Sequence, residues 1–277
     1  MPRTVLFFGD SATRGYGVGR ERRYAALVAA ELASRWNGQW TFEVEATASD
    51  FRTYRTRFAT HLERVHPAVV VCQCPVGPAC FFPRFPLWVR PLMAVRRRTF
   101  SWLKDRYIRN ELRGDASGDR TYRDSLYEGH WLNRLHRWRP SRWPVVGPWW
   151  TARARQLPPI PKITSARYLE RMRALVDDAQ ARGVRQVLVL GPIPVAEDIC
   201  PGYFVRVAAW SLELRAAFDT PERGVRFLDL FAALRDIPSE RLLLRDRIHP
   251  SPEGHREVAR LLTPTLEPLL SLAAAVD

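Results

Sequence analysis

The sequence predicts an α/β protein in which a central parallel β-sheet lies between two layers of helices. Three observations support this fold class. Five short runs of β-branched and aliphatic residues recur along the chain, and each is typical of a strand buried on both faces. Stretches with apolar residues three and four positions apart lie between or after these runs and indicate helices. Because a parallel sheet needs crossover helices on both faces, the alternation predicts a three-layer α/β/α sandwich.

The expected strands are short and strongly apolar. They are Thr4–Phe8, Thr41–Ala46, Ala68–Cys74, Gln186–Leu190 and Val225–Leu230. The expected helices are Arg22–Trp36, Arg52–Val65, Ser165–Arg182, Tyr203–Phe218 and Pro252–Leu262. In sheets of this kind the reactive groups gather outside the carboxyl ends of the strands, so that edge is where we look for a site.

The length and composition fit one large domain, 1–277. A chain of 277 residues can bury a sizeable core, and 46% hydrophobic with 26% charged residues is ordinary for a globular protein. The N-terminal residues lack the basic and apolar segments of a signal peptide, and no apolar run approaches the roughly 20 residues of a membrane span. We therefore expect a soluble, cytoplasmic protein.

The net charge of +14 is concentrated in one segment. Residues 79–163 hold 18 Lys and Arg against six Asp and Glu, with seven of the ten tryptophans and nine of the 22 prolines. The segment interrupts the α/β pattern after the third strand, so we predict an insertion. Three roles stay open for it: a satellite core with a solvated arginine face, a lid over the substrate, or a surface that contacts an anionic carrier or membrane through residues 84–113. Nucleic acid is not an expected partner.

The cysteines do not indicate a disulfide framework or a metal centre. Cys72, Cys74, Cys80 and Cys200 are too few for a disulfide scaffold in a chain without an export signal. No histidine or further cysteine stands at zinc-type spacing from them. We expect reduced, buried thiols and no bound metal.

A candidate nucleophile follows the first expected strand. Gly9-Asp10-Ser11 places a serine where that strand ends and the next helix begins. The glycine allows a tight turn, and backbone N–H groups at a helix start, including that of Ser11, can donate to a developing oxyanion.

A candidate base and its orienting group lie near the C-terminus, in Asp246-Arg247-Ile248-His249-Pro250. A serine needs a base, and the base needs a third group to orient it. Proline keeps the backbone of His249 extended, and Ser251 can cap the helix that Pro252 begins. The imidazole is therefore expected on a loop, within reach of Asp246.

These motifs resemble those of the SGNH, or GDSL, hydrolase superfamily, which has a nucleophile in Gly-Asp-Ser and a base in Asp-x-x-His. The resemblance covers most of the chain outside 79–163. It implies a flavodoxin-like sheet and a catalytic triad of Ser11, Asp246 and His249, with no cofactor.

The chain departs from the family's pattern at the oxyanion hole. The family supplies a glycine N–H after the second strand and an asparagine side chain after the third. This chain has Glu45-Ala46-Thr47-Ala48-Ser49-Asp50 and Val76-Gly77-Pro78-Ala79 there. We expect Ser11 N–H to be retained, and Gly77 N–H or a side chain such as Arg84 to replace the missing donors. Asp10, Arg84 and Trp88 are candidate substrate contacts.

The expected function is hydrolysis of a carboxylic ester or thioester through an acyl-enzyme on Ser11. The substrate would be a small-molecule or carrier-bound acyl group with an apolar part, because the tryptophans of 79–163 suit an acyl chain. Two alternatives stay open. One is acyl transfer by the same triad, and the other is a weakly catalytic binding protein whose basic insertion docks on an anionic carrier or membrane.

Overall fold

The computed structural model describes residues 2–46, 51–79, 163–197, 200, 202–245 and 247–275. Its five strands are β1 (Arg3–Gly9), β2 (Trp40–Ala46), β3 (Val69–Gln73), β4 (Gln186–Leu190) and β5 (Val225–Leu228). They form one sheet in the order β2-β1-β3-β4-β5, and every neighbouring pair is parallel. The predicted α/β class with a central parallel sheet is confirmed. This strand order is the flavodoxin-like one: from β1 the sheet extends to β2 on one side and to β3, β4 and β5 on the other.

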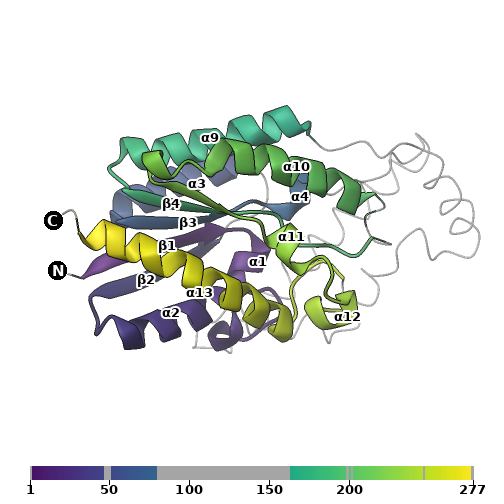
Figure 1. Ribbon diagram of the computed structural model, residues 1–277, viewed down its shortest axis with the longest axis horizontal. Coiled ribbons are helices and arrows are strands. Elements are labelled where there is room, and N and C mark those ends of the chain that lie inside the picture. Colours follow the sequence, from purple (N-terminus) through teal and green to yellow (C-terminus); the bar gives the residue numbers. More distant parts are fainter. Residues whose placement is uncertain are drawn as a thin grey trace, which may run out of the picture. The chain divides into compact units, whose positions relative to one another are not determined.

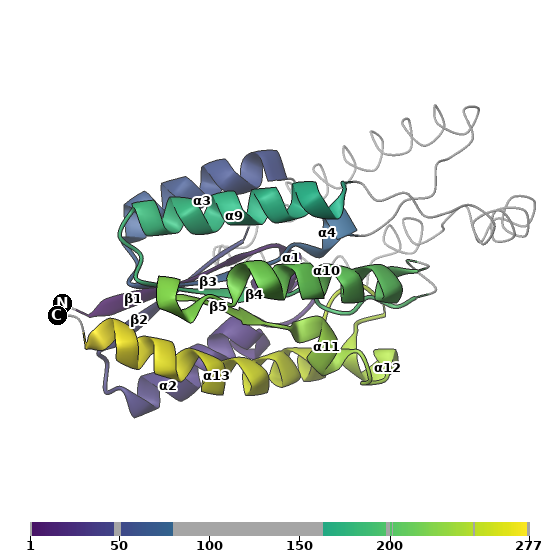
Figure 2. The same ribbon diagram turned by 45° about the horizontal axis from the view of Figure 1, so that its top comes forward.

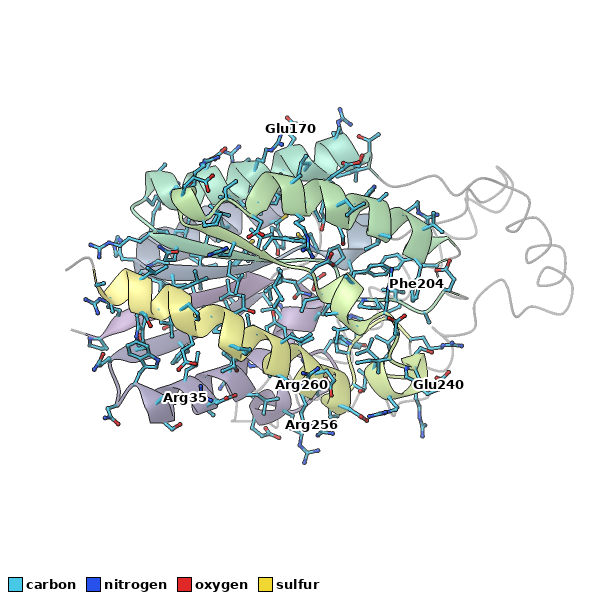
Figure 3. The ribbon with its side chains drawn as sticks, viewed as in Figure 1. Arg35, Glu170, Phe204, Glu240, Arg256 and Arg260 are labelled. Atoms are coloured by element: carbon cyan, nitrogen blue, oxygen red, sulfur yellow. The ribbon has the colours of Figure 1, made fainter. Side chains whose placement is uncertain are left out.

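Helices cover both faces of the sheet (Figures 1 and 2). On one face lie α3 (Phe51–Val65), α9 (Ser165–Ala181) and α10 (Tyr203–Phe218), and on the other lie α2 (Tyr24–Arg35) and α13 (Pro252–Ala274). Each helix turns an apolar stripe inward, as a layered fold requires. On α13, Val258 and Leu262 are buried, whereas Arg256 and Arg260 point away from the sheet (Figure 3).

The carboxyl ends of the central strands lie side by side. Gly9 at the end of β1 is in register with Ala46 of β2, and Phe8 is in register with Cys72 of β3. From β1 the sheet extends to β2 on one side and to β3 on the other, and in folds of this kind ligands bind at the carboxyl edge beside such a switch point. Residues that follow β1 and β3 are therefore placed to form a site together.

Most expected boundaries lie within two residues of the observed ones, and two of the differences have a clear physical cause. The fifth strand ends at Leu228, because Asp229 caps a helix, α11 (Leu230–Leu234), by accepting a hydrogen bond from Ala232 N at 3.0 Å. The last helix continues twelve residues beyond Leu262 and contains Pro264 and Pro268. Its apolar face stays buried along this length, so packing outweighs the backbone hydrogen bonds that the prolines remove.

The short helix α1 (Ser11–Arg14) begins at Ser11, where a helix start was expected. Four other short elements had no expected counterpart: η1 (Arg20–Arg22), α4 (Val76–Ala79), η3 (Pro221–Arg223) and α12 (Ser239–Leu242). The chain divides into two compact units, Met1–Phe81 with Pro161–Asp277, and Phe82–Ile160. The second unit, which contains most of the predicted insertion, lies outside the described residues. Among the helices that the structure describes, none combines the length and apolar character needed to cross a membrane.

Candidate active site

Ser11 begins the one-turn helix α1 directly after β1. Gly9 makes this turn possible, because a Cβ atom at that position would lie 1.8 Å from Thr13 Oγ1 and 3.0 Å from Gln73 Cβ. The side chain of Asp10 caps the helix by accepting a hydrogen bond from Ala12 N at 2.9 Å. The hydroxyl of Ser11 is consequently held at the carboxyl edge of the sheet.

Asp10 also binds the segment that follows β3. Its second carboxylate oxygen accepts a hydrogen bond from Val76 N, the first residue of α4, at 3.2 Å. Asp10 is only 3% exposed, and this burial raises the pKa of its carboxyl, against the lowering effects of the Ala12 N–H and of His249. Both oxygens serve the protein's own backbone. The predicted substrate contact of Asp10 stays a prediction that this burial does not favour.

Buried polar side chains connect the helix α1, which carries Ser11, to neighbouring elements. Thr13 Oγ1 is 2.8 Å from the hydroxyl of Tyr24 and also donates a hydrogen bond to Gln73 Oε1. Tyr24 donates to the same Gln73 oxygen at 3.3 Å. All three side chains are fully or almost fully buried, so the cluster joins α1, α2 and the end of β3 where water does not compete.

His249 lies on a tight loop, which is closed by two backbone hydrogen bonds. Leu244 N donates to the carbonyl of His249 at 2.7 Å, and Arg247 N donates to the carbonyl of Leu244 at 2.7 Å. Arg247 has a positive φ of 62°, which is unusual for a residue with a side chain. Its carbonyl accepts a hydrogen bond from Ala196 N at 3.1 Å, which ties the loop to the segment after β4.

The structure brings Ser11 and His249 together. Ser11 Oγ and His249 Nε2 are 2.8 Å apart, a normal hydrogen-bond distance. The hydroxyl can donate to Nε2 only in the tautomer that carries its proton on Nδ1, and that N–H then needs an acceptor. Asp246, the predicted acceptor, lies outside the described residues.

The candidate oxyanion donors are only partly described. Ser11 N lies in the first turn of α1, where helix N–H groups lack partners within the helix. Gly77 follows Val76, whose N–H contacts Asp10, so the segment with Gly77 begins next to the nucleophile's turn. Residues 47–50, Arg84 and Trp88 lie outside the described residues.

A second histidine is part of the buried core. His255 on α13 is fully buried, its Nδ1 accepts a hydrogen bond from Tyr24 N at 3.2 Å, and its ring stacks on Tyr24 with centroids 5.9 Å apart. Burial lowers the pKa of His255 to about 3. The imidazole is therefore neutral at physiological pH and acts as a core side chain.

The described thiols are buried and none belongs to a metal-type cluster. Cys72, Cys74 and Cys200 are buried thiols outside any disulfide among the described residues, and burial raises the pKa of Cys72 to about 12. In the described ranges, no group of three or more His, Cys, Asp or Glu side chains is arranged to hold a metal ion. Cys80 lies outside those ranges.

Three contacts of the site were missed from sequence. Val76, Gln73 and Tyr16 belong to neither motif, yet Val76 contacts Asp10, Gln73 contacts Thr13, and the ring of Tyr16 lies against that of His249. For Gln73 the available signal was a polar side chain at the end of an apolar strand. Val76 and Tyr16 carry no such local signal.

No protein-family model matches the sequence, and none of the curated proteins matches it significantly. Solved structures do resemble it along almost its whole length. A lipase/acylhydrolase from Enterococcus faecalis is 14% identical with a TM-score of 0.56, covering 96% of this chain and 95% of its own. A member of the lipolytic protein G-D-S-L family from Veillonella parvula is 12% identical with a TM-score of 0.55, covering 96% and 98%.

The psychrotrophic esterase EstA from Pseudoalteromonas sp., in a structure inhibited by monoethylphosphonate, is 12% identical with a TM-score of 0.53, covering 97% of this chain and 99% of its own. At these identities the likeness concerns the fold. The chain therefore has the fold of the lipolytic G-D-S-L hydrolases, the superfamily that its Gly9-Asp10-Ser11 and Asp246-x-x-His249 motifs resemble.

Proposed function

We propose that this protein is a serine hydrolase that cleaves a carboxylic ester or thioester through an acyl-enzyme on Ser11. The observation that carries the proposal is the 2.8 Å separation of Ser11 Oγ and His249 Nε2 at the carboxyl edge of the sheet. A serine hydroxyl is a weak nucleophile unless an adjacent base takes its proton, and this pair has the required distance.

The reaction would proceed in two proton-balanced halves. As Ser11 Oγ attacks the acyl carbonyl carbon, its proton moves to His249 Nε2. When the tetrahedral intermediate collapses, the bond to the leaving group breaks and the imidazolium gives that proton to the departing alcohol or thiol. Water then repeats the sequence on the acyl-enzyme and releases the acid. In this scheme Asp246 orients the imidazole, and no cofactor takes part.

The oxyanion would be held by backbone groups. Ser11 N–H at the start of α1 is the first proposed donor, and Gly77 N–H at the start of α4 is the second. Asp10 supports this arrangement, because its carboxylate accepts hydrogen bonds from both α1 and α4. The loss of one such donor typically costs about 10²–10³-fold in rate, so a hole without the usual asparagine is compatible with a working enzyme.

The similar structures support the same chemistry. They include a lipase/acylhydrolase, a lipolytic G-D-S-L protein and an esterase inhibited by a phosphonate. Organophosphorus compounds of this type react with activated serines. A fluorophosphonate is therefore a suitable probe for Ser11.

The test measures the mass of the intact protein after incubation with a fluorophosphonate. We expect one adduct on the wild type, none on Ser11→Ala, and the loss of ester cleavage in the same variant. Ser34→Ala is the matched control, because Ser34 is an exposed serine on α2 whose hydroxyl donates a hydrogen bond to Glu31 O of the same helix. A wild type without adduct, or an adduct that persists in Ser11→Ala, overturns the proposal.

The acyl group is proposed to be apolar, with Arg84 and Trp88 as substrate contacts. The support is the sequence of residues 79–163, with seven tryptophans and a charge excess of 18 cationic over six acidic side chains. A series of p-nitrophenyl esters tests it: kcat/KM should rise from acetate to octanoate. A preference for acetate would argue against an apolar acyl pocket.

A further inference from the structure

Tyr16 packs its ring against the imidazole of His249. The two ring centroids are 4.3 Å apart and the planes are inclined by 32°, which makes this contact closer than most aromatic pairs. Both residues are half-buried. Tyr16 lies outside the Gly9-Asp10-Ser11 and Asp246-x-x-His249 motifs, and the proposed reaction steps do not use it.

The backbone fixes Tyr16 to the nucleophile. Gly15 adopts a left-handed conformation with φ of 73°, and its N–H donates to Ala12 O at 3.1 Å. The N–H of Tyr16 donates to the carbonyl of Ser11 at 3.0 Å. These two bonds form a Schellman motif that closes α1 after a single turn. The residue that carries the nucleophile therefore also anchors the main chain of Tyr16.

We infer that Tyr16 is a positioning residue for His249, an inference that rests on the proposed function. One residue thus links the two reacting groups: its main chain binds Ser11, and its ring restricts the imidazole. The stack opposes rotation of the imidazole away from Ser11 Oγ. Alignment of this kind matters because small misplacements of a catalytic group are costly in rate.

The ring also stabilises charge at the moment when it forms. In the proposed reaction His249 becomes an imidazolium when it accepts the proton of Ser11, and the face of an aromatic ring attracts a cation within about 6 Å. This interaction is stronger in the transition state than in the ground state, so it acts on kcat and leaves KM unchanged. A residue that merely lined the substrate pocket would act on KM.

The test compares Tyr16→Leu, which removes the ring, with Tyr16→Phe, which retains it. For acetate ester hydrolysis we expect kcat to fall about tenfold in Tyr16→Leu with KM within about twofold of wild type, and Tyr16→Phe to stay within about twofold in both constants. The rate constant of fluorophosphonate labelling should fall in parallel. In proton NMR, the ring-current shift of the His249 ring protons should persist in Tyr16→Phe and disappear in Tyr16→Leu.

Two results would overturn the inference while leaving the proposed function intact. One is a labelled wild type together with a Tyr16→Leu variant of unchanged kcat, whether or not its KM changes. The other is a Tyr16→Phe variant that loses as much kcat as Tyr16→Leu. A wild type that is never labelled refutes the proposed function itself. If Tyr16→Leu does not fold, Tyr16→Met takes its place with the same expected values.

Discussion

Val76 N donates a hydrogen bond to Asp10 Oδ2 at 3.2 Å, and this contact joins the segment after β3 to the turn that carries Ser11. The other oxygen of Asp10 caps α1 through Ala12 N. A single carboxylate thus holds together the two backbone segments from which the proposed oxyanion donors come. Because β1 and β3 are parallel neighbours in the sheet, the segments that follow them begin next to each other.

The first prediction concerns this carboxylate. Asp10→Ala removes an N-cap and leaves two buried N–H groups unpaired, so the free energy of unfolding should fall by about 2 kcal/mol and kcat for ester hydrolysis by at least about tenfold. Asp229→Ala is the matched control, because Asp229 caps α11 in the same way through Ala232 N. Urea denaturation and initial rates measure both. Equal losses of activity in the two variants would show that stability alone is responsible.

The second prediction concerns the pH dependence of stability. Burial lowers the pKa of His255 from 6.5 to about 3, so between these values the unfolded chain binds a proton that the folded protein excludes. The stabilising contribution is therefore complete above pH 6.5 and is lost as the pH falls towards 3, with a total of roughly 5 kcal/mol. Urea denaturation at several pH values measures this slope.

His255→Asn should flatten that slope. The side-chain oxygen of asparagine can replace Nδ1 as the acceptor for Tyr24 N, and it does not titrate. His66→Asn is the control, since His66 is exposed and has a positive φ of 46° that asparagine tolerates well. If both variants retain the wild-type dependence of stability on pH, His255 is not the source of that dependence.

Much of the sheet could be predicted from sequence, because a strand buried on both faces is a continuous apolar run. Gln186–Leu190 was predicted with both ends correct for this reason. The predicted ends were wrong where a capping or packing interaction outweighed the local sequence preference. The capping side chain of Asp229 ended β5 early, and the buried face of α13 carried the helix past Pro264 and Pro268.

The site was predictable only where its residues form contiguous motifs. Ser11 and His249 are 238 positions apart, yet each lies in a short recognisable pattern, and the strand alternation places both at one edge. The contacts of Val76 and Tyr16 depend on the three-dimensional course of the backbone. No local periodicity carries that information. Asp246 and the insertion stay predictions, because they lie outside the described residues.

The third prediction concerns the buried polar cluster of Thr13, Tyr24 and Gln73. Thr13→Val keeps the side chain's shape but removes the hydroxyl that bonds to Tyr24 and Gln73. A buried acceptor that loses a partner costs about 1–3 kcal/mol, so we expect a loss of stability in that range and a slower labelling of Ser11. Thr13→Ser keeps the hydroxyl and should lose less than half as much. Equal effects of serine and valine would assign the role of Thr13 to its methyl group.

The fourth prediction tests the backbone of the loop that carries His249. Arg247 has a φ of 62°, and its N–H and carbonyl both take part in hydrogen bonds, to Leu244 O and from Ala196 N. Asparagine tolerates this left-handed conformation, whereas a β-branched side chain does not. Arg247→Asn should therefore keep the wild-type stability within about 1 kcal/mol and the labelling rate of Ser11 within about threefold.

Arg247→Val should be the damaging member of the series. A valine can leave the left-handed region only if the loop moves, so we expect a loss of at least about 2 kcal/mol in stability. Because that movement would shift His249 Nε2 from Ser11 Oγ, fluorophosphonate labelling should be at least about tenfold slower. Arg245→Val is the matched control: it removes the same charge and introduces the same side chain two positions earlier, at an exposed residue. Urea denaturation and labelling kinetics measure all three variants. If Arg247→Val behaves like Arg245→Val, the conformation at position 247 does not hold the base in place, and the closure of the loop by Leu244 N and Arg247 N must suffice on its own.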